Sequence, residues 1–391
     1  MKNKLQIVFL DFDDIRNPLL GAGQASATYQ IAKRLVKKGH KVTVLSSRFP
    51  GSKDRTQDGI RYTHIGLGTN NIKVNNAAYI LSVPLAVSKV KADIVVECFT
   101  APISTLLSPL FTKIPVVIVP ASFEAERFSK LYHLPFHLIE KYGARIYKYH
   151  LPLSEFTDEK MKKLNKNIIA KIVPEGVSEE FFAIKKKKAK HILFLGRFDM
   201  GQKGIDLLLQ AYKKAAKTLS YPLVIAGHGP DEQKIKALIT KLGLDEQVAM
   251  VGSAYGEVKE RLLSESIAVA LPSRHETFSC FGLEALASGL PLLVFRIPGL
   301  SWLNDACAVQ AKPFSVEQYA KALRTVESAG KMRLMSKNAR LHAGNFTWDS
   351  VVAEYESFFY EILAREDSQL RIPAFKSRVV IRAIERSSYA K

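Results

Sequence analysis

The stretch HILFLGRFDMGQKGIDLLLQAY, residues 191–212, decides the fold of the second half of the chain. It opens with a short apolar run of the kind that is buried on both faces of a parallel sheet, and a helical pattern follows from Ile205. Similar runs recur in PLVIAGHG, QVAMVG, IAVALPS and PLLVF, up to residue 295, with helical patterns between them. This alternation predicts a parallel sheet covered by helices.

The first half of the chain repeats the alternation. The apolar runs LQIVFL, KVTVLS, DIVVEC, PVVIV and YHLPLS lie between residues 5 and 154, and the first helix is expected near Ser26–Lys38. We therefore predict an α/β chain with two Rossmann-like domains, separated by a lysine run whose like charges repel and resist burial. The expected division is a first domain over 1–184, a basic linker over 185–190, a second domain over 191–345, a helix over 346–366 and a basic tail over 367–391.

Composition narrows the class of partner. With 391 residues, 47% of them hydrophobic, the chain is large enough for two domains with cores. Its 57 Lys and Arg against 37 Asp and Glu leave a net charge of +20, most of it before residue 191. Such an excess indicates an acidic partner, which could be a phosphate group, a nucleic acid or an anionic membrane surface.

The three cysteines, Cys98, Cys280 and Cys307, are far apart and fit neither a disulfide framework nor a zinc site. Acidic residues follow the first apolar run at once, so the start of the chain is interpreted as a strand rather than a signal peptide. The longest uncharged stretches are shorter than the roughly 20 residues of a membrane helix. We expect a cytoplasmic protein that can lie on a membrane surface.

The strongest chemical signal is LPSRHETFSCFGLEALASGLP, residues 271–291, in which a strand leads through a loop into a helix. Glu276 in the loop and Glu284 in the first turns of the helix can face one ligand from two sides of the helix N-terminus. The amides of Phe278, Ser279 and Cys280 are free donors there, suited to a phosphate. The alternative is that the acidic residues only stabilise the helix dipole.

A second signal lies around Gly196-Arg197 and Lys203-Gly204, where a strand ends and a helix begins. Arg197 and Lys203 would project into the cleft and clamp a diphosphate, unless they are ordinary solvated cations. Gly21 and Gly23 form a glycine-rich turn that a phosphate could approach, although the longer dinucleotide fingerprint is absent. Each of these signals is weak alone, and together they indicate one cleft between the domains.

These motifs, with Gly227-His-Gly229-Pro230 and Phe346-Thr-Trp348, resemble the retaining glycosyltransferases of the family 4 type, also called glycosyl transferases group 1. GHKVTVLS at 39–46 and VPEGVSEEFF at 173–182 look like the family's GHxVxV and xPNGVDxxxF segments. The resemblance implies the GT-B fold, in which two Rossmann-like domains face each other and a C-terminal helix returns to the first. It also implies transfer of a hexose-type sugar from a UDP- or GDP-linked donor to a glycan or lipid-linked glycan.

The resemblance also assigns roles to residues. Arg197 and Lys203 would hold the diphosphate, Glu284 the ribose and Glu276 the transferred sugar. The amides of Phe278 and Ser279, with Gly21 and Gly23, would meet the phosphates or the sugar, and backbone near Gly252 would contact the base. Ser122 or Glu124 would have to replace the histidine that many members carry in the first domain. Ser279 stands where glycine is common, and its side chain could narrow the donor pocket.

No metal or cofactor is expected, because Asp13 and Asp14 in DFDD are interpreted as shaping the first turn. The segment 136–150, FHLIEKYGARIYKYH, places Phe136, Ile139, Tyr142, Ile146 and Tyr149 on one stripe, either an interfacial helix or a helix packed on its own sheet. Two other functions stay open. A nucleotide-sugar epimerase would use the donor without an acceptor, and a nucleic-acid-binding protein is suggested by the net charge alone.

Overall fold

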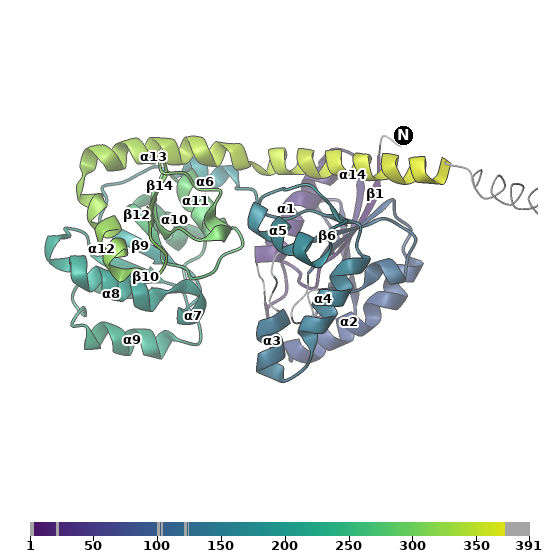
Figure 1. Ribbon diagram of the computed structural model, residues 1–391, viewed down its shortest axis with the longest axis horizontal. Coiled ribbons are helices and arrows are strands. Elements are labelled where there is room, and N and C mark those ends of the chain that lie inside the picture. Colours follow the sequence, from purple (N-terminus) through teal and green to yellow (C-terminus); the bar gives the residue numbers. More distant parts are fainter. Residues whose placement is uncertain are drawn as a thin grey trace, which may run out of the picture.

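The computed structural model describes residues 4–20, 23–99, 102, 105–120, 123 and 125–371. Two α/β domains lie side by side, and two successive helices near the C-terminal end run across both of them (Figure 1). Each domain contains one sheet with helices packed on it. The predicted fold class, two Rossmann-like domains with a helix returning to the first, is confirmed.

The first domain holds an eight-stranded sheet in which only the first strand of the order runs antiparallel to its neighbour. Buried apolar residues fill its central strands, as expected where helices cover both faces. In sheet order the strands are β3 (Arg55–Gln57), β4 (Ile60–Ile65), β2 (Lys41–Ser47), β1 (Gln6–Leu10), β5 (Ile94–Cys98), β6 (Val116–Val119), β7 (Tyr149–His150) and β8 (Ile169–Ala170). The chain order reverses between β1 and β5, and a crevice forms at such a reversal.

The β3–β4 hairpin was not among the predicted strands. Its turn is Asp58-Gly59, and both residues have positive φ, 50° and 76°. Asp-Gly is the pair that favours this two-residue turn, so the sequence did carry a signal.

The helices of the first domain are α1 (Gly23–Lys37), α2 (Ile72–Lys89), α3 (Ala125–Tyr132), α4 (Phe136–Gly143) and α5 (Glu155–Leu164), whereas α6 (Glu179–Ala183) lies with the second domain (Figure 1). Helix α2 starts where the Asn71 side chain accepts hydrogen bonds from the Lys73 and Val74 amides. Its buried residues Tyr79, Val83 and Val87 recur every four positions and face the sheet. No helix in the described ranges is long and apolar enough to cross a bilayer.

The segment 136–150 is not one amphipathic helix, so that prediction was wrong. Helix α4 ends at Gly143, a 3-10 turn follows over Ala144–Ile146, and Tyr149 is fully buried in β7. A Cβ at Gly143 would come within 2.5 Å of the Thr105 hydroxyl oxygen, which shows how tightly the chain packs there. Tertiary packing therefore overrides the helical pattern after Gly143.

The second domain holds a six-stranded, wholly parallel sheet. Its strands are, in sheet order, β11 (Val248–Gly252), β10 (Leu223–Ala226), β9 (His191–Leu195), β12 (Ser266–Leu271), β13 (Leu292–Phe295) and β14 (Ala308–Ala311). Its helices are α7 (Met200–Lys203), α8 (Ile205–Ala215), α9 (Glu232–Lys241), α10 (Gly256–Ser264), α11 (Cys280–Ala287), α12 (Val316–Arg324) and α13 (Ala329–Ala343). The chain order reverses between β9 and β12, and the loops that follow these two strands carry the predicted site.

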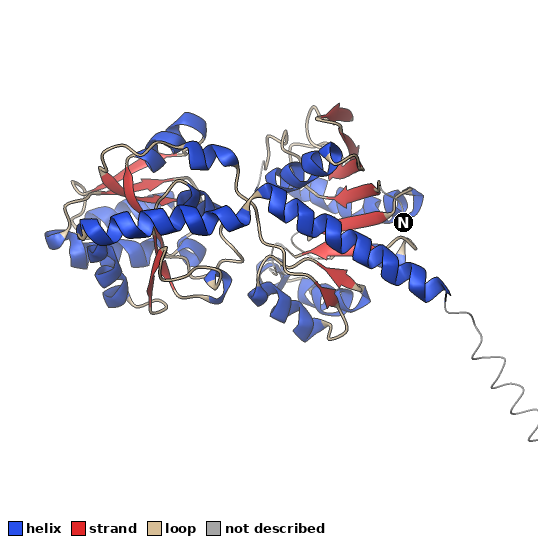
Figure 2. Ribbon diagram, turned by 90° about the horizontal axis from the view of Figure 1, so that it is seen from above, coloured by secondary structure: helices blue, strands red, loops and turns tan. Residues whose placement is uncertain are grey.

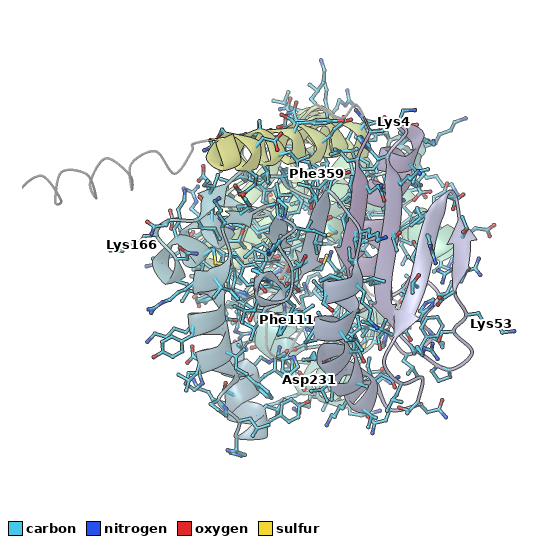
Figure 3. The ribbon with its side chains drawn as sticks, turned by 90° about the vertical axis from the view of Figure 1, so that its right-hand side faces the viewer. Lys4, Lys53, Phe111, Lys166, Asp231 and Phe359 are labelled. Atoms are coloured by element: carbon cyan, nitrogen blue, oxygen red, sulfur yellow. The ribbon has the colours of Figure 1, made fainter. Side chains whose placement is uncertain are left out.

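Helix α14 (Trp348–Arg371) leaves the second domain and packs along the first (Figure 2). The Thr347 hydroxyl caps its first turn by accepting from the Ser350 amide at 3.2 Å. Phe359 lies beneath the helix on the side of the first sheet (Figure 3). The helix continues past the expected end at residue 366, because no glycine or proline interrupts the sequence before Pro373.

Surface ion pairs attach α14 to the first domain. Arg34 reaches Asp349 at 2.7 Å, Lys38 reaches Glu356 at 2.6 Å, and Lys148 reaches Glu366 at 2.7 Å. Beneath them, the buried rings of Tyr149 and Phe358 pack edge to face. Apolar contact therefore supplies the attachment, and the exposed pairs add little to it.

The lysines of the run at 185–190 are exposed, yet the run is bonded to the second domain. The Lys187 and Lys190 amides donate to the carbonyls of Ser264 and Glu265, at 2.9 and 2.7 Å. The Lys186 amine donates to two further carbonyls, those of Leu263 and Ser266. Carbonyl acceptors at the end of α10 thus hold the run against the second domain.

Candidate nucleotide-sugar site

The loops after β9 and β12 meet at an ion pair. Glu276 is only 7% exposed, and its Oε1 lies 2.6 Å from the Lys203 amine and accepts from the Ser273 hydroxyl at 2.7 Å. Both Glu276 and Lys203 were predicted site residues, and the structure brings them together. The Glu276 carboxylate therefore neutralises the charge of Lys203 in this structure.

Two glycines allow these loops to approach each other. Gly204 has φ +65°, and a Cβ there would lie 2.1 Å from the Pro272 carbonyl oxygen. A Cβ on Gly299 would lie 1.7 Å from the carbonyl oxygen of Glu276 itself. Gly299 was missed in the sequence, because nothing local in PGL reveals a contact with a loop more than twenty residues earlier.

The N-terminus of α11 keeps donors for a ligand. Within the described part of the chain, no hydrogen bond is made by the amides of Phe278, Ser279 or Cys280. The Phe278 ring is buried and stacks on Trp302 at 4.6 Å between centroids, so only its backbone can reach a ligand. Trp302 also donates to the Phe278 carbonyl at 2.7 Å and was not predicted as a supporting residue.

Ser279 adopts φ +88°, a conformation that favours glycine. Its side chain turns back onto the helix, where the hydroxyl accepts from the Gly282 amide at 3.2 Å. The serine at this position therefore acts as the helix N-cap.

Glu284 pairs with a second lysine, Lys259 of α10, at 2.5 Å. Burial raises the pKa of Glu284, and the neighbouring Lys259 opposes that shift. The Lys259 amine also lies 4.8 Å from the centroid of the Phe181 ring. Sequence reasoning missed Lys259, since a lysine on a helix has no distinctive local pattern.

Arg197 is more exposed than the other predicted charges. It donates to the Gln202 side chain and lies 3.7 Å from Asp199. Asp199 is also 3.5 Å from Arg127, which belongs to α3 of the first domain. The structure therefore joins Arg197 to a small network that reaches the other domain, and Lys203 stands apart with Glu276.

A cavity of about 380 Å³ lies between the two domains. Its walls include Gly23 and Ser26 of α1, Glu175 and Phe181, and Tyr255, Lys259, Cys280 and Glu284 of the second domain. Gly23 is the first residue of α1 rather than part of a preceding turn. Gly21, Ser122 and Glu124, also predicted for this site, lie outside the described residues.

Gly252 ends β11 at the rim of the second sheet. It has φ +72°, and its carbonyl accepts from the Gly227 amide at 2.7 Å. A Cβ on Gly227 would lie 1.9 Å from the Gly196 carbonyl oxygen, so the loops after β9, β10 and β11 are in close contact. The neighbouring side chains of His228 and Ser253 are linked at 2.8 Å.

The acidic residues after β1 are buried and satisfied. Asp13 accepts from the Asn17 side chain, and Asp14 accepts two bonds of 2.7 Å from Arg55. Burial raises the pKa of Asp11 to about 7, although its bond from Thr28 opposes the shift. These contacts agree with the interpretation that Asp13 and Asp14 shape the first turn. Over the described ranges, no three His, Cys, Asp or Glu side chains are grouped so as to hold a metal ion.

The two domains also touch beside the Glu276 loop. The Ser154 hydroxyl, at the start of α5, donates to the Thr277 carbonyl at 3.0 Å. The Phe156 and His275 rings lie 6.0 Å apart, edge to face. The loop that carries Glu276 is thus in contact with the first domain.

A cleft between two Rossmann-like domains, with unbonded helix amides and lysines paired with glutamates near the strand ends, is typical of proteins that bind a phosphorylated ligand. The model of glycosyltransferase family 4 matches residues 21–181, and that of glycosyl transferases group 1 matches residues 177–342. The chain belongs to this family of glycosyltransferases and has their GT-B fold.

Among curated relatives, the MMP alpha-(1->4)-mannosyltransferase of Mycolicibacterium hassiacum is 28% identical over 204 residues, which cover 50% of this chain and 49% of that protein. The match thus spans about half the length of this relative.

Two solved structures share the fold. WaaG, a glycosyltransferase involved in lipopolysaccharide biosynthesis, has a TM-score of 0.68 at 20% identity and covers 90% of this chain and 99% of its own. Anabaena HepE in complex with UDP-glucose has a TM-score of 0.69 at 16% identity, with the same coverage.

Proposed function

We propose that this protein is a retaining glycosyltransferase that moves a hexose-type sugar from a UDP- or GDP-linked donor to a glycan or lipid-linked glycan. The observation that carries the proposal is the Lys203–Glu276 pair beside the free amides of α11, at the reversal point of the second sheet. A mannosyltransferase among the relatives and a neighbour bound to UDP-glucose support a nucleotide-sugar donor.

In the proposed reaction, the donor diphosphate lies against the N-terminus of α11 and the two cations Arg197 and Lys203. These groups stabilise the negative charge that develops as the sugar–phosphate bond breaks. The diphosphate replaces Glu276 as the ion-pair partner of Lys203. The Glu276 carboxylate then accepts hydrogen bonds from hydroxyls of the transferred sugar. Glu284, already lining the inter-domain cavity, accepts the ribose hydroxyls.

Retention of configuration requires the acceptor hydroxyl to attack from the face that the phosphate leaves. The leaving phosphate can then take the acceptor proton, and no enzyme nucleophile is required. The role of the protein is to hold the two substrates in this geometry.

Calorimetric titration with UDP-glucose and GDP-mannose tests the donor site. Affinity should fall at least tenfold in Glu284→Ala and Lys203→Ala, and should be unchanged in Lys217→Ala, an exposed lysine of the same domain. Unchanged affinity in both site variants would refute the proposal. Release of free nucleotide only when an acceptor glycan is added separates a transferase from an epimerase.

We also propose that the protein meets its acceptor at the cytoplasmic face of the membrane, in cell-envelope polysaccharide or glycolipid synthesis. Exposed apolar residues gather on neighbouring helices of the first domain: Leu81 and Leu85 on α2, Leu131 on α3, and Leu138 and Tyr142 on α4. The Lys73 amine lies 5.2 Å from the Tyr132 ring centroid and links α2 to α3, while Lys141 and Arg145 flank Tyr142. Apolar side chains with basic neighbours fit an anionic lipid surface.

Sedimentation with vesicles tests this surface. Vesicles rich in phosphatidylglycerol should bind the protein, and phosphatidylcholine vesicles should bind it less. The double change Leu81→Ser and Leu85→Ser should reduce binding, whereas Leu334→Ser and Leu341→Ser, which alter equally exposed leucines of α13, should not. Equal loss in both double variants would exclude α2 as the docking surface.

A further inference from the structure

Glu175 is a buried carboxyl group without a partner in the inter-domain cavity. It lies in the loop between β8 and α6, is 8% exposed, and lines the cavity together with Gly23, Cys280 and Glu284. It makes no hydrogen bond or ion pair with any residue that the structure describes. Burial raises the pKa of Glu175 to about 7.

The surroundings of Glu175 offer no free cation among the described residues. Cys98 at the end of β5, Cys280 of α11 and Tyr355 of α14 are the titratable groups that interact with it electrostatically. Glu180, Glu260, Glu284 and Lys259 also line the cavity, but Lys259 is already paired with Glu284. A lone buried carboxylate is costly, so the neutral form is favoured.

The position of Glu175 also matters. The cavity wall on one side is the start of α1 at Gly23, and on the other the start of α11 at Cys280. Both helix ends favour a phosphate, and Glu284 stands farther along the same wall. In the segment VPEGV, Glu175 occupies the place of the neutral asparagine in the xPNGVD pattern.

We propose that Glu175 contacts the bound nucleotide-sugar donor as a neutral carboxyl group, which donates a hydrogen bond to an oxygen of the ribose–diphosphate half. The inference rests on the proposed function. An ionised carboxylate at this place would repel the diphosphate, whereas a neutral one attracts it. Donor binding above neutral pH therefore takes up one proton at Glu175, and no covalent bond changes.

The test is titration with UDP-glucose and GDP-mannose at pH values between about 6 and 8.5. The affinity of the wild-type protein should be constant below pH 7, because Glu175 is then protonated. Above pH 7 the affinity should fall, and the fall should approach about tenfold per pH unit, because only the protonated form binds well. Glu175→Gln, which stays neutral and can still donate, should bind equally well at every pH. Glu179→Gln, an exposed glutamate four positions away, should follow the wild type.

Proton uptake gives a second readout. Titrations at pH 8 in buffers of different ionisation enthalpy should show about one proton taken up by the wild type and none by Glu175→Gln. Thermal melting of Glu175→Gln establishes that the variant is folded.

Three outcomes overturn the inference while the proposed function stands: a flat pH profile in the wild type, an unchanged slope in Glu175→Gln, or weak binding by folded Glu175→Gln at every pH. Absence of binding by either donor at any pH would refute the proposed function itself.

Discussion

The carboxyl ends of the two sheets carry acidic residues of very different kinds. After β1, Asp13 and Asp14 are buried and bonded within their own domain, to Asn17, Arg55 and His64. After β12, Glu276 is also nearly buried, yet its partner Lys203 comes from α7, and free helix amides lie nearby. Satisfied acids of the first kind hold a turn in place, whereas pairs of the second kind can exchange partners with a ligand.

The largest effect is expected from a substitution that breaks the Lys203–Glu276 ion pair. In the proposed reaction, Lys203→Ala removes a cation from the leaving diphosphate and leaves the buried Glu276 without its paired cation, so turnover should fall by about 10²–10³. A transfer assay measures this, with Lys217→Ala as the matched control. Turnover within twofold of wild type would place Lys203 outside the catalytic machinery.

The satisfied acids should affect folding rather than turnover. Although burial favours the neutral form of Asp14, bonds from His64 and Arg55 hold its pKa below the usual range. Its contribution to stability is therefore present above its ordinary pKa of about 4 and is lost as pH falls below that value.

Asp14→Asn should lower the free energy of unfolding by about 2–4 kcal/mol at pH 7, and the difference should shrink below about pH 4. Urea unfolding at several pH values measures this. A difference that stays constant with pH would show that the Asp14 charge is not stabilising.

An intermediate effect on stability is expected where the second-domain loops are in close contact at Gly299. Gly299→Ala places a Cβ against the Glu276 carbonyl, so the loop must shift, and stability should fall by about 1–3 kcal/mol with reduced turnover. Gly330→Ala is the control, because a Cβ there meets nothing within 4 Å. Equal melting temperatures for the two variants would contradict the packing described for Gly299.

The smallest effect on stability is expected at a site away from the carboxyl ends of both sheets. Arg34→Ala breaks the pair between the partly buried Arg34 and the exposed Asp349 that joins α1 to α14, which should cost about 0.2–1 kcal/mol and fade at high salt. Thermal unfolding at low and high ionic strength checks this. A salt-independent loss above about 2 kcal/mol would give the pair a structural role that its exposure does not support.

Because apolar periodicity and strand-end motifs are contiguous in sequence, local patterns predicted most strands of both sheets, but not β3, β4 or β14. They failed where distant segments decide the outcome. Lys259, Trp302 and Gly299 support predicted residues from other elements, so no local pattern marks them. The end of α4 at Gly143 depends on contact with Thr105, more than thirty residues earlier.

The two places where the chain crosses between the domains are fastened to each other. The Val177 amide donates to the Phe346 carbonyl at 2.8 Å, and Gly176 leaves no space for a side chain against the Trp348 ring. Because the two interdomain segments contact each other at this point, they cannot move apart independently. A side chain in place of Gly176 would therefore disturb both crossings at once, although it lies outside the sheets of either domain.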